Sequence, residues 1–135
     1  MKKVILSIAI MAALALNAQG TTIVNEDNKT GIRTSTAVGE NHGNIGDKAV
    51  DLSYSYTTSG ALGATGYVST ALGLKTTASG TSSTAMGENT TASGRGSTAM
   101  GEKTIASGWR STAMGWQTTA SGISSITMGY DTTAS

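Results

Sequence analysis

The chain has 135 residues, enough for one ordinary domain, with no Cys, Pro or Phe and a single His. Without cysteine it cannot use disulfides to compensate for a small core, and so few large apolar side chains give a compact monomer little to offset its chain entropy. Of nine Lys or Arg and eight Asp or Glu, Lys2 and Lys3 precede Gln19, so seven cations and eight anions remain from there on, which offers no basic surface for nucleic acid.

Residues 1–18 predict a secretory signal peptide. Two lysines precede an apolar stretch over residues 4–16, small or polar residues follow, and cleavage is expected after Ala18. The stretch is too short for a membrane-spanning helix, which needs about 20 apolar residues. We therefore expect an exported chain, located at the cell surface or outer membrane or in the extracellular medium, that does not insert into a membrane by itself.

Residues 19–65 are less regular and predict an N-terminal cap that contains one divergent repeat. The segment "STAVGEN" at residues 35–41 matches "STAMGEN" at residues 83–89 in six of seven positions, which indicates a first coil. Solenoids need atypical end coils to cover the stack. A period of two within this segment also predicts a half-buried strand, whose alternating apolar residues are Val50, Leu52, Tyr54 and Tyr56.

Residues 66–135 form a strict repeat. Glycines occur at positions 66, 73, 80, 87, 94, 101, 108, 115, 122 and 129, and the full unit is the fourteen-residue pattern T-x-A-S-G-x-x-S-T-A-M-G-x-x. A coiled coil is excluded because the pattern lacks large apolar residues at two positions of each heptad, and a glycine in every heptad costs a helix about 1 kcal/mol. A disordered linker has this composition but no need for a strict register.

The repeat therefore predicts an all-β fold, a parallel β-solenoid of fourteen-residue coils. Each unit is expected to hold two short strands, such as "TTAS" at residues 76–79 and "STAM" at residues 83–86, each ending at a glycine that adopts the positive φ of a turn. Successive coils then stack about 4.8 Å apart. A flattened coil has room inside only for small side chains, so Ala85 is expected inside and Met86 outside.

The outward methionines form an apolar stripe, which on a soluble protein usually marks an interface. The stripe would supply the buried surface that a small interior lacks, so we expect three chains to associate through it. The candidate trimer-interface residues are Leu72, Met86, Met100, Met114 and Met128.

The two free positions after each glycine hold every charged residue, Trp and Tyr from Gly66 onward. Strand residues are fixed by stacking in register, whereas corner residues project into solvent and are free to differ. Trp116 and Tyr130 are expected to stack on one ridge, and Trp109 to lie above Arg95 on the other. These aromatic residues either bind a partner or stabilise neighbouring coils. The candidate surface-binding residues are Trp109, Arg110, Trp116 and Tyr130.

Catalysis finds no support, and we expect neither an enzyme nor a cofactor or metal site. A Ser/His/Asp triad would need His42, which we interpret as a solvated turn residue in "ENHGN". Asp47 and Asp51 are interpreted as surface charge rather than an acid/base pair. The glycine-rich "GALGATG" at residues 60–66 lacks the Lys-Ser/Thr ending of a phosphate loop.

The repeats resemble the head domain of the trimeric autotransporter adhesins, the YadA-like head. The resemblance covers residues 66–135 well and residues 31–41 in part. It implies a left-handed parallel β-roll, association of three rolls through apolar strand residues, and a virulence-related role in cell adhesion by binding extracellular matrix or cell surfaces. The segments that carry it are "ASGTSSTAMG", "ASGRGSTAMG", "ASGWRSTAMG" and "ASGISSITMG".

The sequence departs from that family in one respect, because the coiled-coil stalk and membrane anchor of such adhesins are not present in it. The chain stops at "DTTAS", one residue before the glycine that its rhythm demands, so we expect a truncated reading frame. Similar head repeats also occur in phage tail-fibre-like proteins, which leaves a structural fibre protein as an alternative.

A third hypothesis is an ice-binding solenoid, in which regular ranks of threonine on a flat face order water. The same threonines also suit strands through their β-propensity. One rank would contain Thr76, Thr90, Thr104, Thr118 and Thr132; beside it would lie Thr77, Thr91, Thr119 and Thr133, interrupted by Ile105.

Overall fold

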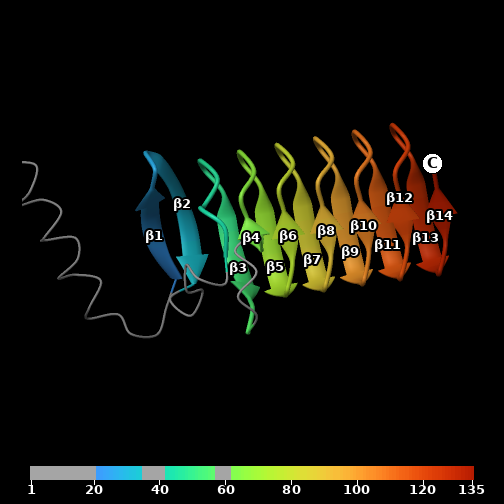
Figure 1. The fold of residues 1–135 in the computed structure, drawn as a ribbon, viewed down its shortest axis with the longest axis horizontal. Coiled ribbons are helices and arrows are strands. Elements are labelled where there is room, and N and C mark those ends of the chain that lie inside the picture. The colour runs from blue at the N-terminus through green and yellow to red at the C-terminus, as the bar shows by residue number, and fades with distance from the viewer. Residues whose placement is uncertain (1–20, 35–41, 57–61) are drawn as a thin grey trace, which may run out of the picture.

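The computed structural model describes residues 21–34, 42–56 and 62–135 (Figure 1). The predicted signal peptide at residues 1–18 and the divergent repeat at residues 35–41 lie outside the described residues. Every regular element of the described residues is a β-strand. The described residues contain no helix long and apolar enough to cross a membrane.

The strands form two sheets. One, here called the long-strand sheet, runs in the order β1-β2-β3-β5-β7-β9-β11-β13, and the other, the short-strand sheet, runs β14-β12-β10-β8-β6-β4. The long-strand sheet consists of β1 (Thr21–Glu26), β2 (Lys29–Thr34), β3 (Val50–Tyr54), β5 (Thr70–Leu74), β7 (Thr84–Glu88), β9 (Thr98–Glu102), β11 (Thr112–Trp116) and β13 (Ile126–Tyr130). The short-strand sheet consists of β4 (Gly63–Ala64), β6 (Thr77–Ala78), β8 (Thr91–Ala92), β10 (Ile105–Ala106), β12 (Thr119–Ala120) and β14 (Thr133–Ala134).

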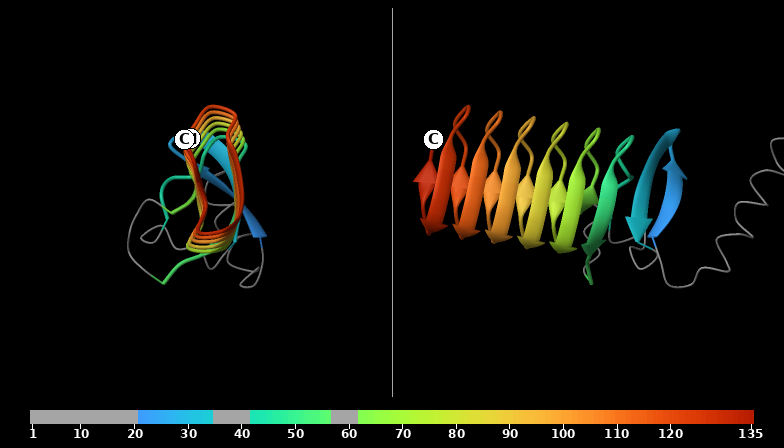
Figure 2. Two further views of the ribbon diagram at one scale, coloured as in Figure 1. Left: turned by 90° about the vertical axis from the view of Figure 1, so that its right-hand side faces the viewer. Right: turned by 180° about the vertical axis from the view of Figure 1, so that it is seen from behind.

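Each coil contributes one long and one short strand, and the coils stack in register. Between β5 and β7, for example, Ala71 pairs with Ala85 and Leu72 with Met86, in parallel. Seen along the stack, the coils superpose as one narrow, elongated loop (Figure 2). The prediction of an all-β parallel solenoid is confirmed.

The interior is built from small residues because the two sheets are too close for anything larger. Alternation along each strand sends one alanine of β5, β7, β9 and β11 and one alanine of each short strand inward. These alanines are fully buried and form two continuous columns: Ala71, Ala85, Ala99 and Ala113, and Ala78, Ala92, Ala106 and Ala120. Serines such as Ser83 and Ser97 lie in the same interior. The predicted inward alanines are confirmed.

The first threonine rank is buried, which corrects the ice-binding hypothesis. Thr76, Thr90, Thr104 and Thr118 have no exposed surface, because they turn inward where the chain enters each short strand. Only the second rank, which includes Thr77 and Thr91, reaches the outer face of the short-strand sheet. A single rank does not provide the two-dimensional threonine lattice on which that hypothesis rests.

The two glycine columns differ in backbone conformation, which corrects the prediction that every strand ends at a glycine with positive φ. Gly87, with φ 116°, lies inside β7. Gly80 has no positive φ, and its role is steric: a Cβ there would collide with the carbonyl of Gly94 in the next coil. The left-handed turn conformation falls instead on the second corner residue, as at Ser82 and Asn89, both with φ 55°.

The same stacking continues upstream of the strict repeat. Gly46 lies against Gly66 as Gly66 lies against Gly80, although Gly46 and Gly66 are 20 residues apart in sequence instead of 14. Strand β3 therefore occupies the position of a long strand, and Leu52 pairs with Leu72.

The alternation in β3 was predicted correctly as a strand but with the wrong face buried. Asp51 and Ser53 point inward and are buried, whereas Val50, Leu52 and Tyr54 face outward. The reason is register, because Asp51 pairs with Ala71 and must take the inward position of the alanine column.

A hairpin completes the long-strand sheet at its N-terminal end. β1 and β2 pair in antiparallel fashion through the two-residue turn Asp27-Asn28, in which both residues have positive φ. Such turns match the twist of the flanking strands. β2 then pairs in parallel with β3, so the hairpin forms the N-terminal end of the long-strand sheet (Figure 1).

We predict that Gly94→Ala lowers the free energy of unfolding by about 3 kcal/mol, because the new methyl group collides with the backbone of Gly108 in the next coil. The matched control is Gly96→Ala. There a Cβ meets only the Arg110 side chain at 3.8 Å, and φ of 65° costs alanine about 1 kcal/mol. Denaturant unfolding of both variants checks this, and equal losses would contradict the steric role of the Gly94 column.

We also predict that Thr104→Val raises the free energy of unfolding by about 1 kcal/mol. The Thr104 hydroxyl is buried without a hydrogen-bond partner among the described residues, and valine keeps its shape while removing the unsatisfied group. Thr104→Ala serves as the control, since it removes the hydroxyl but also leaves a cavity and should be less stable than the valine variant. A loss of stability in the valine variant would show that the hydroxyl is satisfied.

Candidate functional site

The outer face of the long-strand sheet carries the predicted apolar stripe as an unbroken column. Leu72, Met86 and Met100 occupy equivalent positions in successive strands, and the column continues through Met114 to Met128. Leu72 is 39% exposed and Met128 64%, whereas the three methionines between them are half-buried by their neighbours in the column. The structure places the predicted residues together on one face; their role in a trimer stays a prediction.

The stripe is longer and wider than the sequence indicated. Leu52 extends it by one coil, because it pairs with Leu72. A second outward column lies beside it, with apolar residues at both ends and threonines between. This column contains Val50, Thr70, Thr84, Thr98, Thr112 and Ile126.

Two ridges of corner residues run along the stack, one at each end of the flattened coil (Figure 2). The first ridge, which leads into the long strands, consists of the pairs Asp47-Lys48, Tyr67-Val68, Thr81-Ser82, Arg95-Gly96, Trp109-Arg110 and Ile123-Ser124. The second ridge, which follows the long strands, consists of Tyr54-Ser55, Leu74-Lys75, Glu88-Asn89, Glu102-Lys103, Trp116-Gln117 and Tyr130-Asp131. Backbone hydrogen bonds continue through both, as from Ser82 N to the Tyr67 carbonyl at 2.8 Å.

The second ridge carries the predicted aromatic stack. The rings of Trp116 and Tyr130 lie 4.5 Å apart between centroids and are inclined by only 10°. The ammonium of Lys103 lies 5.3 Å from the centroid of the Trp116 ring and 3.3 Å from a carboxylate oxygen of Glu102. The Trp116–Tyr130 and Lys103–Trp116 contacts join adjacent coils, and an aromatic pair of this kind contributes about 0.5–1.5 kcal/mol.

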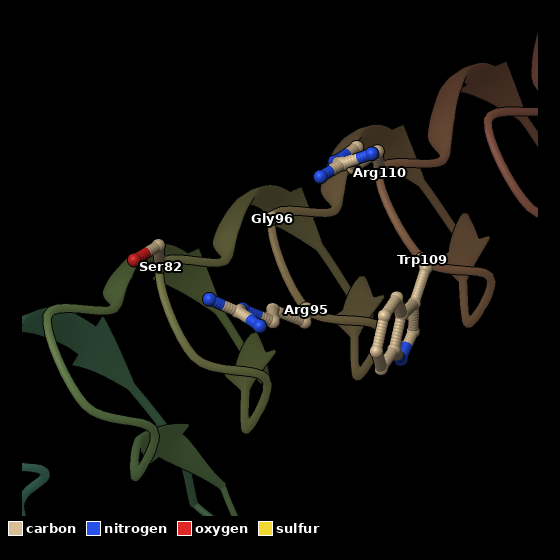
Figure 3. Close-up of a pocket in the computed structure, with 5 residues that line it drawn as sticks. All are labelled: Ser82, Arg95, Gly96, Trp109 and Arg110. Atoms are coloured by element: carbon tan, nitrogen blue, oxygen red, sulfur yellow. The ribbon is translucent and has the colours of Figure 1, made fainter.

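The first ridge holds a surface pocket of about 160 Å³ (Figure 3). The Arg95 guanidinium lies 5.9 Å from the centroid of the Trp109 ring, which confirms the predicted cation–π neighbours. Gly96 has no side chain, so the Arg110 stem beside it is left uncovered (Figure 3). The pocket is lined by Ser82, Arg95, Gly96, Trp109 and Arg110.

The four predicted surface-binding residues therefore do not form one site. Trp109 and Arg110 belong to the first ridge, whereas Trp116 and Tyr130 belong to the second. Sequence reasoning placed Arg95 beside Trp109 but did not include it in the site, although its position fourteen residues before Trp109 was the available signal.

The ridges also differ in charge. The first carries three cations and one anion: Lys48, Arg95 and Arg110 against Asp47. The second carries two cations and three anions: Lys75 and Lys103 against Glu88, Glu102 and Asp131. The first ridge is therefore net positive and the second net negative.

Comparison with known protein families shows which family this chain belongs to. A model of the YadA head domain repeat, two copies long, matches residues 64–90, 78–104, 92–118 and 106–132. The chain belongs to this family. No curated protein and no solved structure matches it. The four matches advance by fourteen residues, which is one coil of the structure.

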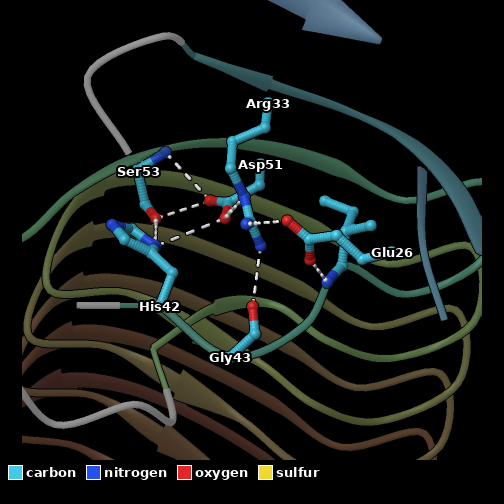
Figure 4. A network of polar contacts seen from close by, with 7 residues as sticks. Glu26, Arg33, His42, Gly43, Asp51 and Ser53 are labelled. Carbon is cyan, nitrogen blue, oxygen red and sulfur yellow. Dashed lines mark hydrogen bonds and ion pairs between the residues drawn. The ribbon is translucent and has the colours of Figure 1, made fainter. Parts of the chain in front are cut away.

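Upstream of the YadA head repeats lies a buried polar cluster at the N-terminal end of the interior (Figure 4). Arg33 donates to Asp51 at 3.2 Å, to Glu26 at 2.8 Å and to the carbonyl of Gly43 at 2.7 Å. His42 Nδ1 lies 3.3 Å from the Asp51 carboxylate. His42 and Asp51 were predicted to be a solvated turn residue and a surface charge; both are buried, which corrects those predictions.

The cluster forms because Asp51 takes an inward position and needs partners there. Gly63 makes room for it, since a Cβ at Gly63 would collide with the Asp51 carboxylate and with His42. The charge of Asp51 is then satisfied by Arg33, His42 and Ser53. Buried charges are tolerated only when paired and hydrogen-bonded in this way.

His42, Asp51 and Ser53 do not have the geometry of a catalytic triad. In a triad the serine contacts the histidine Nε2 and the aspartate contacts Nδ1. Here both Ser53 Oγ, at 3.4 Å, and Asp51, at 3.3 Å, approach Nδ1, and the Ser53 hydroxyl donates directly to Asp51 at 2.6 Å. The arrangement is a structural anchor for the first coils. No group of three or more potential metal-ligating side chains occurs in the described parts of the chain.

The pKa of Asp51 is lowered from its ordinary value. Burial by itself raises that pKa, but hydrogen bonds with His42 and Ser53 outweigh the effect of burial. Because the folded-state pKa lies below the unfolded value of about 3.9, the stability that Asp51 contributes is present above about pH 3.9 and is lost as the pH falls through the folded-state pKa.

We predict that the free energy of unfolding falls on acidification below about pH 4 and that Asp51→Asn removes part of this dependence. At neutral pH the variant should be less stable by about 3 kcal/mol, because Arg33 loses a buried charged partner. Urea unfolding across pH 2–7 measures both effects, with Asp47→Asn on the surface as the control. A parallel pH profile in Asp51→Asn would show that the cluster does not depend on the Asp51 charge.

Proposed function

We propose that this chain is the head region of a secreted or surface-displayed trimeric adhesin, which binds surfaces through its corner ridges. The observation that supports the proposal is the apolar column on the outer face of the long-strand sheet. The interior holds only alanines, serines and threonines along most of its length, so the large apolar side chains are displayed outward. An apolar column that spans the stack has the character of an association surface.

The apolar column runs along the stack, so it suits association about a three-fold axis parallel to the stack. In that arrangement Met86 of each chain lies at the same level as Met86 of the other two, and the same holds for every coil. A two-fold axis perpendicular to the stack would instead place residues from different coils opposite each other, because the two columns would then run in opposite directions. Membership of the YadA head family supports the trimer.

Adhesion then follows from repetition. Three parallel rods display three copies of each ridge, and weak contacts to one surface reinforce each other through their effective concentration. The ridges suit this role, because the residues at ridge positions can be substituted without disturbing the buried columns. The signal peptide predicted for residues 1–18 supports display outside the cytoplasm.

We predict that the purified chain sediments with three times the mass of one chain and that Met100→Glu with Met114→Glu reduces it to one. Two charges per chain at the proposed axis would bring six carboxylates together in an apolar environment. Circular dichroism on the same sample should show unchanged β-structure.

The matched control places the same two charges on the opposite face, as Ser93→Glu with Ser107→Glu, both exposed beside the short-strand sheet. This variant should remain trimeric. On a matrix-coated surface the trimers should bind at least about tenfold more tightly than the monomeric variant, because avidity is lost with the trimer. A wild-type mass of one folded chain would overturn the trimer, and equal surface binding by monomer and trimer would overturn the multivalent mechanism.

A further inference from the structure

We propose that the first ridge binds an anionic polysaccharide, with one acidic sugar unit seated in the pocket of Arg95, Trp109 and Arg110 (Figure 3). This inference rests on the proposed adhesive function and names the chemical class of the surface that the head recognises. It is carried by the two guanidinium groups, the exposed indole and the size of the pocket.

The two arginines are available for an anion. Neither forms an ion pair within the described residues, and the only acidic residue of the first ridge, Asp47, lies three coils before Arg95. That separation is about 14 Å, which exceeds the screening length of about 8 Å at physiological ionic strength. Guanidinium groups bind carboxylates and sulfates through paired hydrogen bonds.

Trp109 supplies an apolar surface beside these cations. Trp109 is 57% exposed, with Arg95 on the side of the preceding coil. An exposed indole offers a flat face against which the C–H groups of a sugar ring can pack while its hydroxyls stay hydrated. The combination of cations and a flat aromatic ring suits an acidic sugar better than an isolated inorganic anion.

The pocket is suited to one unit of a polymer. Its volume of about 160 Å³ is well below the roughly 300–1,000 Å³ of pockets that enclose a drug-sized ligand. One such contact is weak, and it becomes useful when a repeating chain of like charges engages the pockets of several protomers. A nucleic acid is disfavoured, because phosphates spaced about 1.7 Å apart along a duplex call for more cations than this ridge supplies.

The experiment uses the full chain carrying Trp116→Phe, which keeps an aromatic ring against Tyr130 and leaves Trp109 as the only tryptophan. Its fluorescence is titrated with heparin, which bears sulfates and carboxylates, with polygalacturonate, which bears carboxylates alone, and with neutral dextran. We expect a saturable change with one or both anionic polymers and none with dextran. Response to heparin alone would identify sulfate as the recognised group. The apparent affinity should fall as salt is raised.

Two variants test the assignment to the first ridge. Arg95→Gln and Arg110→Gln should each weaken binding about tenfold, since each removes a charge-assisted hydrogen bond. Lys75→Gln removes the same charge from the second ridge and should leave the affinity within about twofold. An equal loss in Lys75→Gln would overturn the site in favour of general charge attraction, and equal competition by a single-stranded oligonucleotide would overturn its selectivity for polysaccharide.

The outcomes separate this inference from the proposed function. If neither anionic polymer changes Trp109 fluorescence while the trimer still binds a matrix-coated surface, the ligand class is wrong and the adhesive role stands. If the polymers bind to a chain that sediments as a monomer, the site stands without the trimer. Failure of polymer binding and of matrix binding together would overturn both.

Discussion

The structure depends on direct contact between the backbones of successive coils. At the column of Gly66, Gly80 and Gly94, each glycine lies so close to the carbonyl of the next that no side chain fits between them. This contact sets the coils in register, and the register brings identical residues into line from one coil to the next. The need for glycine at each of these contacts explains why the repeat is so strict, because a substitution at one such position disturbs two coils at once.

The narrow coil determines where large apolar and charged side chains can lie. From Gly66 onward its interior accepts alanine, serine and threonine, so the methionines, tryptophans and charged residues of the strict repeat lie outside. The outer face of the long-strand sheet thereby becomes an apolar surface, and the two ridges become the variable surface. The positions that maintain the stack are thereby separate from the positions that vary between coils. The aromatic and cation–π contacts of the ridges add stability between coils and also define the shape of the first-ridge pocket.

Much of this could be predicted from the sequence, because a fourteen-residue period with small residues admits few folds. The inward alanines, the outward methionines and the stacked rings of Trp116 and Tyr130 all follow from strand alternation combined with the period. What could not be predicted has a common cause in the segment before Gly66. There the spacing between equivalent glycines is 20 residues, so the period does not reveal that Asp51 aligns with the alanine column. Its burial, and that of His42, depends on partners brought together only by the fold.

The buried threonines were missed for a different reason. Thr76 lies at the bend where the second ridge leads into a short strand, and alternation along the strand does not determine the direction of a residue at a bend. The pocket was missed because it combines corner residues of three successive coils with the absence of a side chain at Gly96. The residue pattern of a single repeat does not show which corner residues of successive coils lie together.

Amide hydrogen exchange resolved by residue tests most directly whether the coils are joined by a continuous backbone ladder that includes the corners. The amides of Ser82 and Arg110 bond the carbonyls of Tyr67 and Arg95 at 2.8 and 2.9 Å. The amides of Thr81 and Trp109, one residue earlier, bond no backbone carbonyl in the described part of the chain. Slow exchange at Ser82 and Arg110 with fast exchange at Thr81 and Trp109 is the predicted result. Fast exchange at all four would contradict the ladder, and with it the stacking on which the outer surfaces depend.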